Sequence, residues 1–252
     1  MIADYPKTAQ IPGLRALWKE AFGDTDLFLD AFFATGFCPR RCRCITDGDH
    51  VLAALYWFGV ICGEQRLAYL YAVATAASHR GRGLFTLLLA DTKRVLTEAG
   101  FDGILLVPES DELGRMYEKF GFFACASNRS FTADAGDTPI PVREIGPTEF
   151  AKLRRELLPE KSVLQEGEML EFLAAQCHFW AGENWLAAGQ IYDGRLACME
   201  LLGDAKAAAG LLRALDVHSG TFRMPGGERP FAWLLPLHDG CVRPAYFAFA
   251  LD

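Results

Sequence analysis

The sequence lacks any apolar run long enough to span a membrane and any excess of basic residues. Its net charge is −7 over 252 residues, which argues against a protein that binds nucleic-acid phosphates along a basic surface. The first six residues lack the basic-then-apolar pattern of a secretory signal. We therefore expect a soluble, cytoplasmic protein that binds neither nucleic acid nor a membrane. Its acidity is compatible with a cationic amine partner.

Metal-binding patterns are missing as well. The five histidines form no metal-type pair, and although three of the eight cysteines fall close together at 38–44, no fourth ligand or paired spacing accompanies them. A zinc site normally needs both. We expect reduced thiols and no metal site. The 51% of hydrophobic residues are ample for one large or two modest domains.

Two familiar phosphate-binding loops are also absent. No glycine is followed, after four residues, by Gly-Lys-Ser/Thr, so there is no P-loop. The dinucleotide-binding fingerprint needs three glycines, and Thr86 stands where the third would follow Gly81 and Gly83. The sequence therefore argues against nucleotide binding through either loop.

A different anion-binding pattern is present at residues 69–85, which read as a strand, a short loop and the start of a helix. Aromatic and β-branched residues fill the first part, and arginine alternates with glycine over 80–83, just before the apolar run 84–96. A helix start attracts anions, glycines allow a phosphate close to the backbone, and arginines add charge. The pattern favours a pyrophosphate-binding loop. The alternative is an ordinary glycine-rich turn between a strand and a helix.

A second informative stretch begins with an expected strand at 101–108. Ser110 follows it as the expected N-cap of a helix, and the segment Met116-Tyr117-Glu118-Lys119-Phe120-Gly121-Phe122 comes next. In this order and spacing, the two motifs resemble the GNAT superfamily of N-acyltransferases. Its acyl-CoA loop has Arg or Gln, two residues, Gly, one residue, then Gly or Ala. Arg80 and Gly83 match, whereas Phe85 departs from the final small residue.

The resemblance implies a site for acetyl-CoA and assigns roles to individual positions. The backbone of one strand would hold the pantetheine arm and the thioester carbonyl, and the loop would bind the pyrophosphate: Val73, Ala74 and Thr75 for the strand, Arg80, Gly81, Arg82, Gly83, Leu84 and Phe85 for the loop. Ser110 would hydrogen-bond the cofactor arm, and Tyr117 would be the general acid toward the leaving thiolate. The alternatives are that Ser110 only caps its helix and that Tyr117 only packs it on the sheet.

The chain is predicted to hold two domains. Residues 1–133 follow the GNAT order of helices and strands, with a helix at 11–22 stopped by Gly23. A linker is expected at 132–139, and residues 140–252 echo the first half, with a second hairpin signal at Asp193-Gly194. At the matching helix start Asp204 would repel a phosphate, which predicts one cofactor site. The alternative is that the second half is not a copy of the first, because any α+β domain shows a similar alternation of helices and strands.

These observations predict an α/β (α+β) GNAT fold, a central mixed sheet flanked by helices, followed by a smaller GNAT-like domain. The expected function is transfer of an acetyl group from acetyl-CoA to the primary amine of a small molecule or peptide. The alternative is a non-catalytic acyl-CoA-binding sensor or partner-binding module. Four aromatic residues are candidates for the acceptor site or for the core: Phe22, Trp57, Tyr69 and Tyr71. Asp24 and Asp26 are candidates for the acceptor site or for helix capping.

Overall fold

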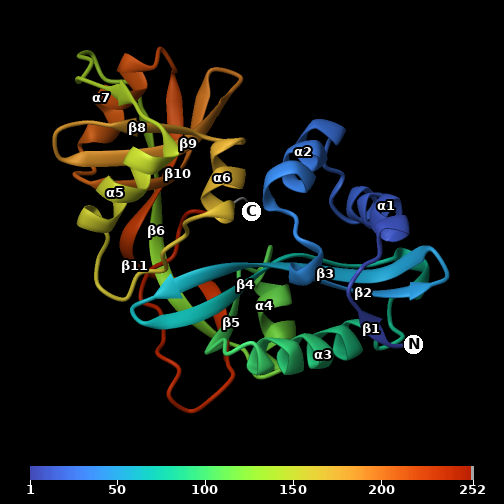
Figure 1. Cartoon of the computed structure of the whole chain (residues 1–252). Coiled ribbons are helices and arrows are strands. Elements are labelled where there is room, and N and C mark those ends of the chain that lie inside the picture. Colours follow the sequence, from blue (N-terminus) through green and yellow to red (C-terminus); the bar gives the residue numbers. More distant parts are fainter. Residues whose placement is uncertain (251–252) are drawn as a thin grey trace. The chain divides into compact units, whose positions relative to one another are not determined.

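The computed structural model describes residues 1–250 (Figure 1). The chain divides into two compact units that are interleaved along the sequence. The first comprises Met1–Val60, Glu64–Leu106 and Leu235–Cys241, and the second comprises Ile61–Gly63, Val107–Leu234 and the described residues from 242 onward. This division differs from the boundaries expected from the sequence, 1–133 and 140–252, which stay a prediction. Each unit is described by itself below.

The first unit combines a five-stranded sheet with three α-helices. In chain order these are β1 (Ala3–Asp4), α1 (Ile11–Phe22), α2 (Asp26–Ala31), β2 (Cys42–Asp47), β3 (His50–Cys62), β4 (Gln65–Thr75), α3 (Leu84–Glu98) and β5 (Gly103–Leu106). Short 3-10 turns lie at Thr8–Gln10, Pro39–Arg41 and Ala77–His79, and a π-helical turn at Phe32–Gly36. Helices α1 and α2 cover one face of the strands and α3 covers the other (Figure 1).

Helix α1 forms where the sequence predicts it. Leu14, Leu17 and Trp18 are buried and share one face of the helix, as apolar residues three or four positions apart do. Gly23 ends the helix in a left-handed conformation with φ 73°, and its N–H donates to the carbonyl oxygen of Lys19 at 3.0 Å. The predicted helix and its glycine stop are confirmed.

The strand order in the first unit is β1-β2-β3-β4-β5. β2 pairs with β1 and β3 in antiparallel fashion, whereas β4 and β5 are parallel. Parallel neighbours need a crossover connection, and α3 supplies it. The loop that leads into α3 therefore lies at the carboxyl end of β4, where ligands bind in many sheets of this kind.

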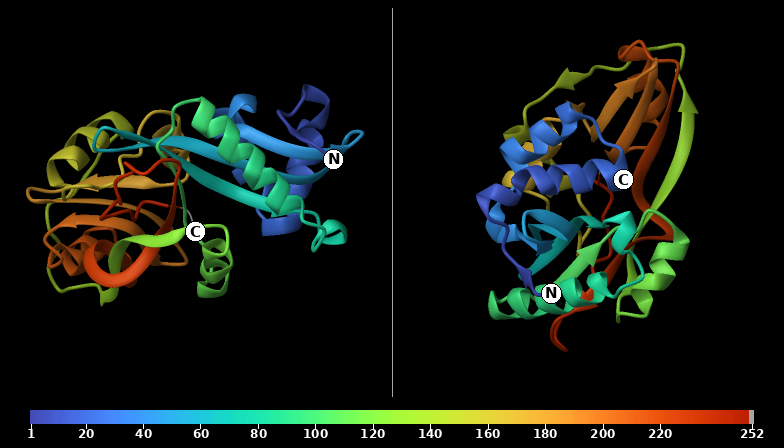
Figure 2. Two further views of the ribbon diagram at one scale, coloured as in Figure 1. Left: turned by 90° about the horizontal axis from the view of Figure 1, so that it is seen from below. Right: turned by 90° about the vertical axis from the view of Figure 1, so that its right-hand side faces the viewer.

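The second unit has four helices and six strands. They are α4 (Asp111–Glu118), β6 (Phe123–Asp134), β7 (Arg143–Glu144), α5 (Pro147–Leu157), α6 (Glu168–Ala174), β8 (His178–Ala181), β9 (Trp185–Tyr192), β10 (Arg195–Gly203), α7 (Ala207–Ala214) and β11 (Ser219–Pro236). The strands lie in the order β7-β8-β9-β10-β11, and β6 also pairs with β11. Figure 2 shows β6 and β11 running side by side.

Strands β10 and β11 repeat the arrangement of β4 and β5. They are parallel and are joined by a helix, α7, and β9 and β10 form an antiparallel hairpin ahead of them. The turn of that hairpin is Asp193-Gly194, with φ 48° and 69°, as a two-residue type I′ turn requires. The hairpin predicted there is confirmed. The apolar core of this part includes Leu201, Leu211 and Phe222.

Two expectations for the second half are wrong in detail. Thr132 to Asp134 are not linker but the end of β6, because they pair with Thr221 to Ser219 of β11. The sequence of 166–179 also predicts a single helix, but the helix ends at Ala174, and Phe179 lies in β8 opposite Ala188 of β9. In both places, pairing with another strand overrides the local composition.

The segment 246–250 is fully buried although it contains no helix or strand. Side chains and backbone groups from other parts of the second unit satisfy its carbonyl oxygens. Val163 N–H donates to Tyr246 O at 2.9 Å, and Arg223 Nη1 donates to Ala248 O at 2.8 Å. Gln165 likewise donates to Phe249 O. Irregular backbone is tolerated in a core only with such partners.

Candidate active site

The carboxyl end of β4 extends beyond its pairing with β5. The two strands pair at Leu67 to Tyr69 with Gly103 to Leu105, and Ala72 then takes a positive φ of 49°. Val73, Ala74 and Thr75 lie past this irregularity and have no register partner on β5 in the described chain. On the side of β5, this strand backbone can offer its N–H and C=O groups to an extended ligand.

The loop between β4 and α3 depends on two glycines. Gly81 and Gly83 have φ 73° and 75°, a region that other residues enter only at a cost. No atom lies within 4 Å of the position that a Cβ would occupy at either glycine. The space on the Cβ side of both glycines is therefore open.

The start of α3 is electrostatically suited to an anion. Its N-cap is Gly83, so no side chain closes the first turn, and no acid lies in that turn. Arg80 and Arg82 are exposed and form no ion pair with any carboxylate of residues 1–250. Arg80 Nε donates to Thr75 O at 3.2 Å, which ties the loop back to β4. The helix start, the glycines and the arginines without a counter-charge together give a surface that is electrostatically suited to an anion such as a pyrophosphate.

A residue that sequence reasoning missed also holds this loop. The Glu20 carboxylate on α1 accepts a hydrogen bond from Ala77 N–H at 2.7 Å. The two residues are 57 positions apart, and no motif marks Glu20. The contact fixes the beginning of the loop that presents Gly81 and Gly83.

Two further predicted site residues, Ser110 and Tyr117, belong to the second unit. Ser110 precedes α4, and its Oγ accepts a hydrogen bond from Leu113 N–H at 3.3 Å. The predicted N-cap is confirmed. Unlike α3, helix α4 carries two acids in its first turn, Asp111 and Glu112, so its start is not a second phosphate site.

Tyr117 lies near the end of α4, with 8% of its surface exposed. Its ring meets that of Phe122 edge to face, with centroids 5.5 Å apart, and Gly121 turns the chain back at φ 91°. Burial raises the pKa of the Tyr117 phenol to about 12. The phenol therefore carries its proton throughout the neutral range, which a proton donor requires.

The expected acceptor-site residues separate into buried and exposed ones. Trp57 and Tyr69 belong to the core, whereas Phe22 is 45% exposed. Asp24 accepts a hydrogen bond from Trp18 Nε1 at 2.8 Å, and Asp26 pairs with Lys19 at 2.8 Å. Thr25, not Asp24, caps α2. Both carboxylates thus have partners within their own unit.

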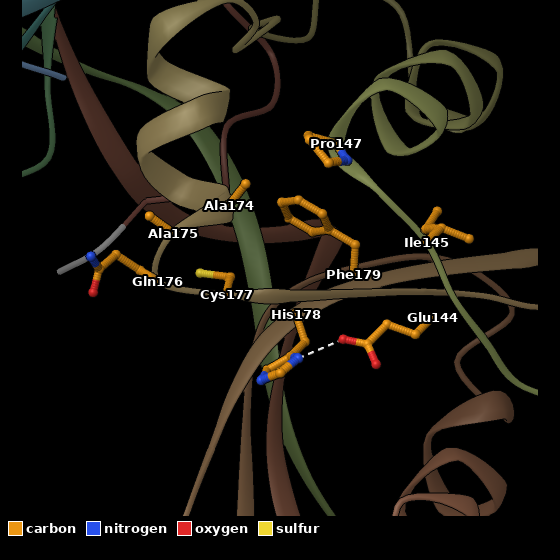
Figure 3. Close-up of a pocket in the computed structure, with 9 residues that line it drawn as sticks. All are labelled: Glu144, Ile145, Pro147, Ala174, Ala175, Gln176, Cys177, His178 and Phe179. Atoms are coloured by element: carbon orange, nitrogen blue, oxygen red, sulfur yellow. Dashed lines mark hydrogen bonds and ion pairs between the residues drawn. The ribbon is translucent and has the colours of Figure 1, made fainter. Parts of the chain in front are cut away.

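A cavity of about 310 Å³ lies in the second unit between the end of α6 and β7 (Figure 3). His178 and Glu144, which form an exposed pair at 2.6 Å, and the buried Phe179 are among the residues that line it. Burial raises the pKa of the neighbouring Cys177 thiol to about 12, so this thiol is not a nucleophile at neutral pH. The cavity shows no catalytic arrangement.

Residues 1–250 contain neither a metal-type cluster nor a membrane-type helix. No group of three or more potential metal ligands occurs in that range. None of its helices combines the length and the apolar character needed to cross a bilayer. All eight cysteines are reduced thiols.

Comparison with known proteins gives a consistent result. Many solved structures share the fold, among them the following three. A GCN5-related N-acetyltransferase from Kribbella flavida has a TM-score of 0.70 at 16% identity, over 92% of this chain and 70% of that one. Eis1 from Mycobacterium abscessus scores 0.67 at 13% identity, over 94% and 74%. A putative acetyltransferase from Pyrococcus horikoshii scores 0.61 at 14% identity, over 98% and 91%. No curated protein matches the sequence.

A family model supplies the identification at the level of sequence. Residues 4–125 match the model described as the acetyltransferase (GNAT) domain. That range includes the β4–α3 loop and the Tyr117 to Phe122 motif, on which the resemblance rests. The resemblance and the expected fold class are confirmed. Residues 4–125 are thus a GNAT acetyltransferase domain.

Proposed function

We propose that the protein is an acetyl-CoA-dependent N-acetyltransferase that acetylates the primary amine of a small molecule or peptide. The observation that carries the proposal is the open helix start at Gly83, with two arginines that lack a counter-charge, inside a GNAT acetyltransferase domain. Acetyl-CoA is the acyl donor of such domains, and a loop of this kind suits its pyrophosphate.

We assign separate roles to the strand backbone and to the loop. The backbone of Val73, Ala74 and Thr75 would orient the pantetheine arm, and residues 80–85 would anchor the pyrophosphate. Bound acetyl-CoA supplies the activated acyl carbonyl. Positioning of this kind is the larger part of what acyl transfer needs.

Tyr117 is proposed as the proton donor. In the reaction a C–N bond to the acceptor forms and the C–S bond breaks; the amine releases a proton to solvent, and the thiolate takes one from the phenol, which solvent restores. A phenol with a pKa of about 12 gives its proton only to a strongly basic partner. A thiolate expelled into a dry site fits that requirement better than one in water. No general base is assigned, because an amine that arrives neutral needs none.

The second unit is proposed to be a degenerate copy that has lost its cofactor site. The parallel pair β10–β11 with its α7 crossover corresponds to β4–β5 with α3. At the start of α7, the Asp204 carboxylate accepts a hydrogen bond from Lys206 N–H at 2.9 Å. An acid that already occupies a helix start disfavours phosphate there.

The test is a thioester-consumption assay with the full chain, acetyl-CoA and a panel of primary amines, beside calorimetric titration with acetyl-CoA alone. We expect one binding site per chain and amine-dependent release of CoA thiol. Binding without turnover by any amine would support the sensor or partner-binding alternative. No binding, or two equivalent sites, would contradict the proposed cofactor site.

A further inference from the structure

The register between β6 and β11 places a set of polar residues on one face of the second unit. Asn128 pairs with Arg229 and Ser130 pairs with Arg223. Directly opposite residues of an antiparallel pair share a face, and so do residues two apart on one strand. Phe231 and Trp233 continue the same face along β11.

A bulge in β11 brings the two arginines together. Met224 and Arg229 are consecutive in the register although four residues separate them, and Gly226 and Gly227 within that excursion have φ 95° and 87°. A Cβ at Gly227 would come within 2.9 Å of Asn128 O and of Arg129 Cβ. The bulge therefore requires glycine and sets the spacing of Arg223 and Arg229. Bulges of this kind often re-aim side chains at binding sites.

These residues line a cavity of about 160 Å³, whose lining also includes Val107, Pro108 and the start of α4. Two of its polar side chains are almost completely buried, Asn128 at 5% and Trp233 at 9% exposed. The indole N–H of Trp233 has no hydrogen-bond partner within residues 1–250. An unmet buried donor costs about 1–3 kcal/mol unless something accepts from it.

The charges of the cavity favour one kind of ligand. Arg229 forms no ion pair with any described carboxylate, and it lies on the same face as Arg223, where like charges repel unless an anion lies between them. Glu109 and Asp111 are exposed at the rim, so a doubly charged phosphate would be repelled more than a singly charged group. The guanidinium of Arg223 lies over the half-buried ring of Phe231, 4.4 Å from its centroid, and the two form a flat wall.

We propose that this cavity, formed by Asn128, Ser130, Arg223, Arg229, Phe231 and Trp233, binds a small planar carboxylate. The carboxylate accepts from the Arg229 guanidinium, whose fork geometry matches it. The planar body of the ligand lies beside the stacked Arg223 and Phe231, and an oxygen of the ligand accepts from the Trp233 indole. The proposal does not depend on acetyltransferase activity.

The test uses the indole N–H signals of the five tryptophans, recorded by ¹H–¹⁵N NMR on the full chain. Sequential assignment, supported by Trp233→Phe, identifies the Trp233 signal. We expect benzoate to move that signal downfield in a saturable way, and benzylamine of the same shape to leave it unchanged. Arg229→Gln, at an exposed position, should weaken benzoate binding about tenfold. The control Arg213→Gln, an exposed arginine on α7, should not change it.

Three results would overturn the proposal. The first is no movement of the Trp233 signal with benzoate. The second is movement with benzylamine instead, which would make this a cation site. The third is loss of the benzoate effect when acetyl-CoA saturates the protein, which would assign the cavity to the donor site. An unchanged benzoate effect in the presence of acetyl-CoA supports a separate site, whether or not the protein proves to be an acetyltransferase.

Discussion

The Glu20 carboxylate accepts a hydrogen bond from Ala77 N–H at 2.7 Å and so joins α1 to the loop that precedes α3. We predict that Glu20→Ala weakens acetyl-CoA binding roughly fivefold, because a contact worth about 1 kcal/mol no longer holds the loop. Glu20→Gln keeps an acceptor oxygen and should bind almost normally. Titration calorimetry on the three proteins compares their dissociation constants. Equal loss in both variants would show that charge, and not this hydrogen bond, matters.

Gly83→Val should abolish the open approach to the start of α3. We expect acetyl-CoA affinity to fall about tenfold or more, because several helix-end contacts of about 0.3–1 kcal/mol each are lost together. Gly48→Val is the matched control. Gly48 also has a positive φ, 59°, with no atom within 4 Å of where a Cβ would lie, but it belongs to the β2–β3 turn. If Gly48→Val keeps the acetyl-CoA affinity despite similar backbone strain, the loss in Gly83→Val comes from the position of Gly83 at the start of α3.

Tyr117→Phe should lower kcat by about a hundred- to ten-thousand-fold and leave the acetyl-CoA dissociation constant nearly unchanged. The phenyl ring preserves the edge-to-face contact with Phe122. Steady-state kinetics and calorimetry measure the two effects separately. Tyr192→Phe, at a 55% exposed position, is the control. Full activity in Tyr117→Phe would leave Tyr117 as a packing residue only.

The buried phenol also predicts a pH dependence of stability. The pKa of Tyr117 is about 12 in the folded chain, against 10.0 for an ordinary tyrosine, so the folded state holds its proton more tightly than the unfolded state does. Its contribution is complete below pH 10 and is lost as the pH rises to about 12, by about 3 kcal/mol in total. Urea unfolding at pH 8 and pH 11 measures the decline. It should be smaller in Tyr117→Phe, and an identical decline would contradict the assignment.

The buried pair of Arg154 and Glu200 supports the second unit. Two hydrogen bonds join them, at 2.5 Å and 3.0 Å, and both side chains are at least 98% buried. Glu200→Gln leaves the guanidinium without a counter-charge and should lower the free energy of unfolding by about 3–5 kcal/mol. Glu166→Gln, which breaks the exposed pair with Arg155, should change it little. Urea denaturation measures the free energy of unfolding of both variants. An equal loss in Glu200→Gln and Glu166→Gln would show that the buried pair contributes no more than the exposed one.

The sequence alone determined the features that depend on neighbouring residues. The α1 helix ends where Gly23 permits a left-handed turn, and the β9–β10 hairpin turns at Asp193-Gly194, as predicted. The glycines before α3 also indicated an open helix start. In each case the backbone conformation is set within a few residues, because φ and hydrogen-bonding capacity are properties of the residue itself.

The tertiary structure decided what depends on distant partners. Glu20 reaches Ala77, residues 132–134 become strand through pairing with β11, and burial raises the pKa of Tyr117. The bulge that brings Arg223 beside Arg229 exists only relative to β6. Strand register, long-range hydrogen bonds and desolvation are set by which surfaces meet. No local pattern encodes that choice, because many pairings satisfy the same alternation of polar and apolar residues.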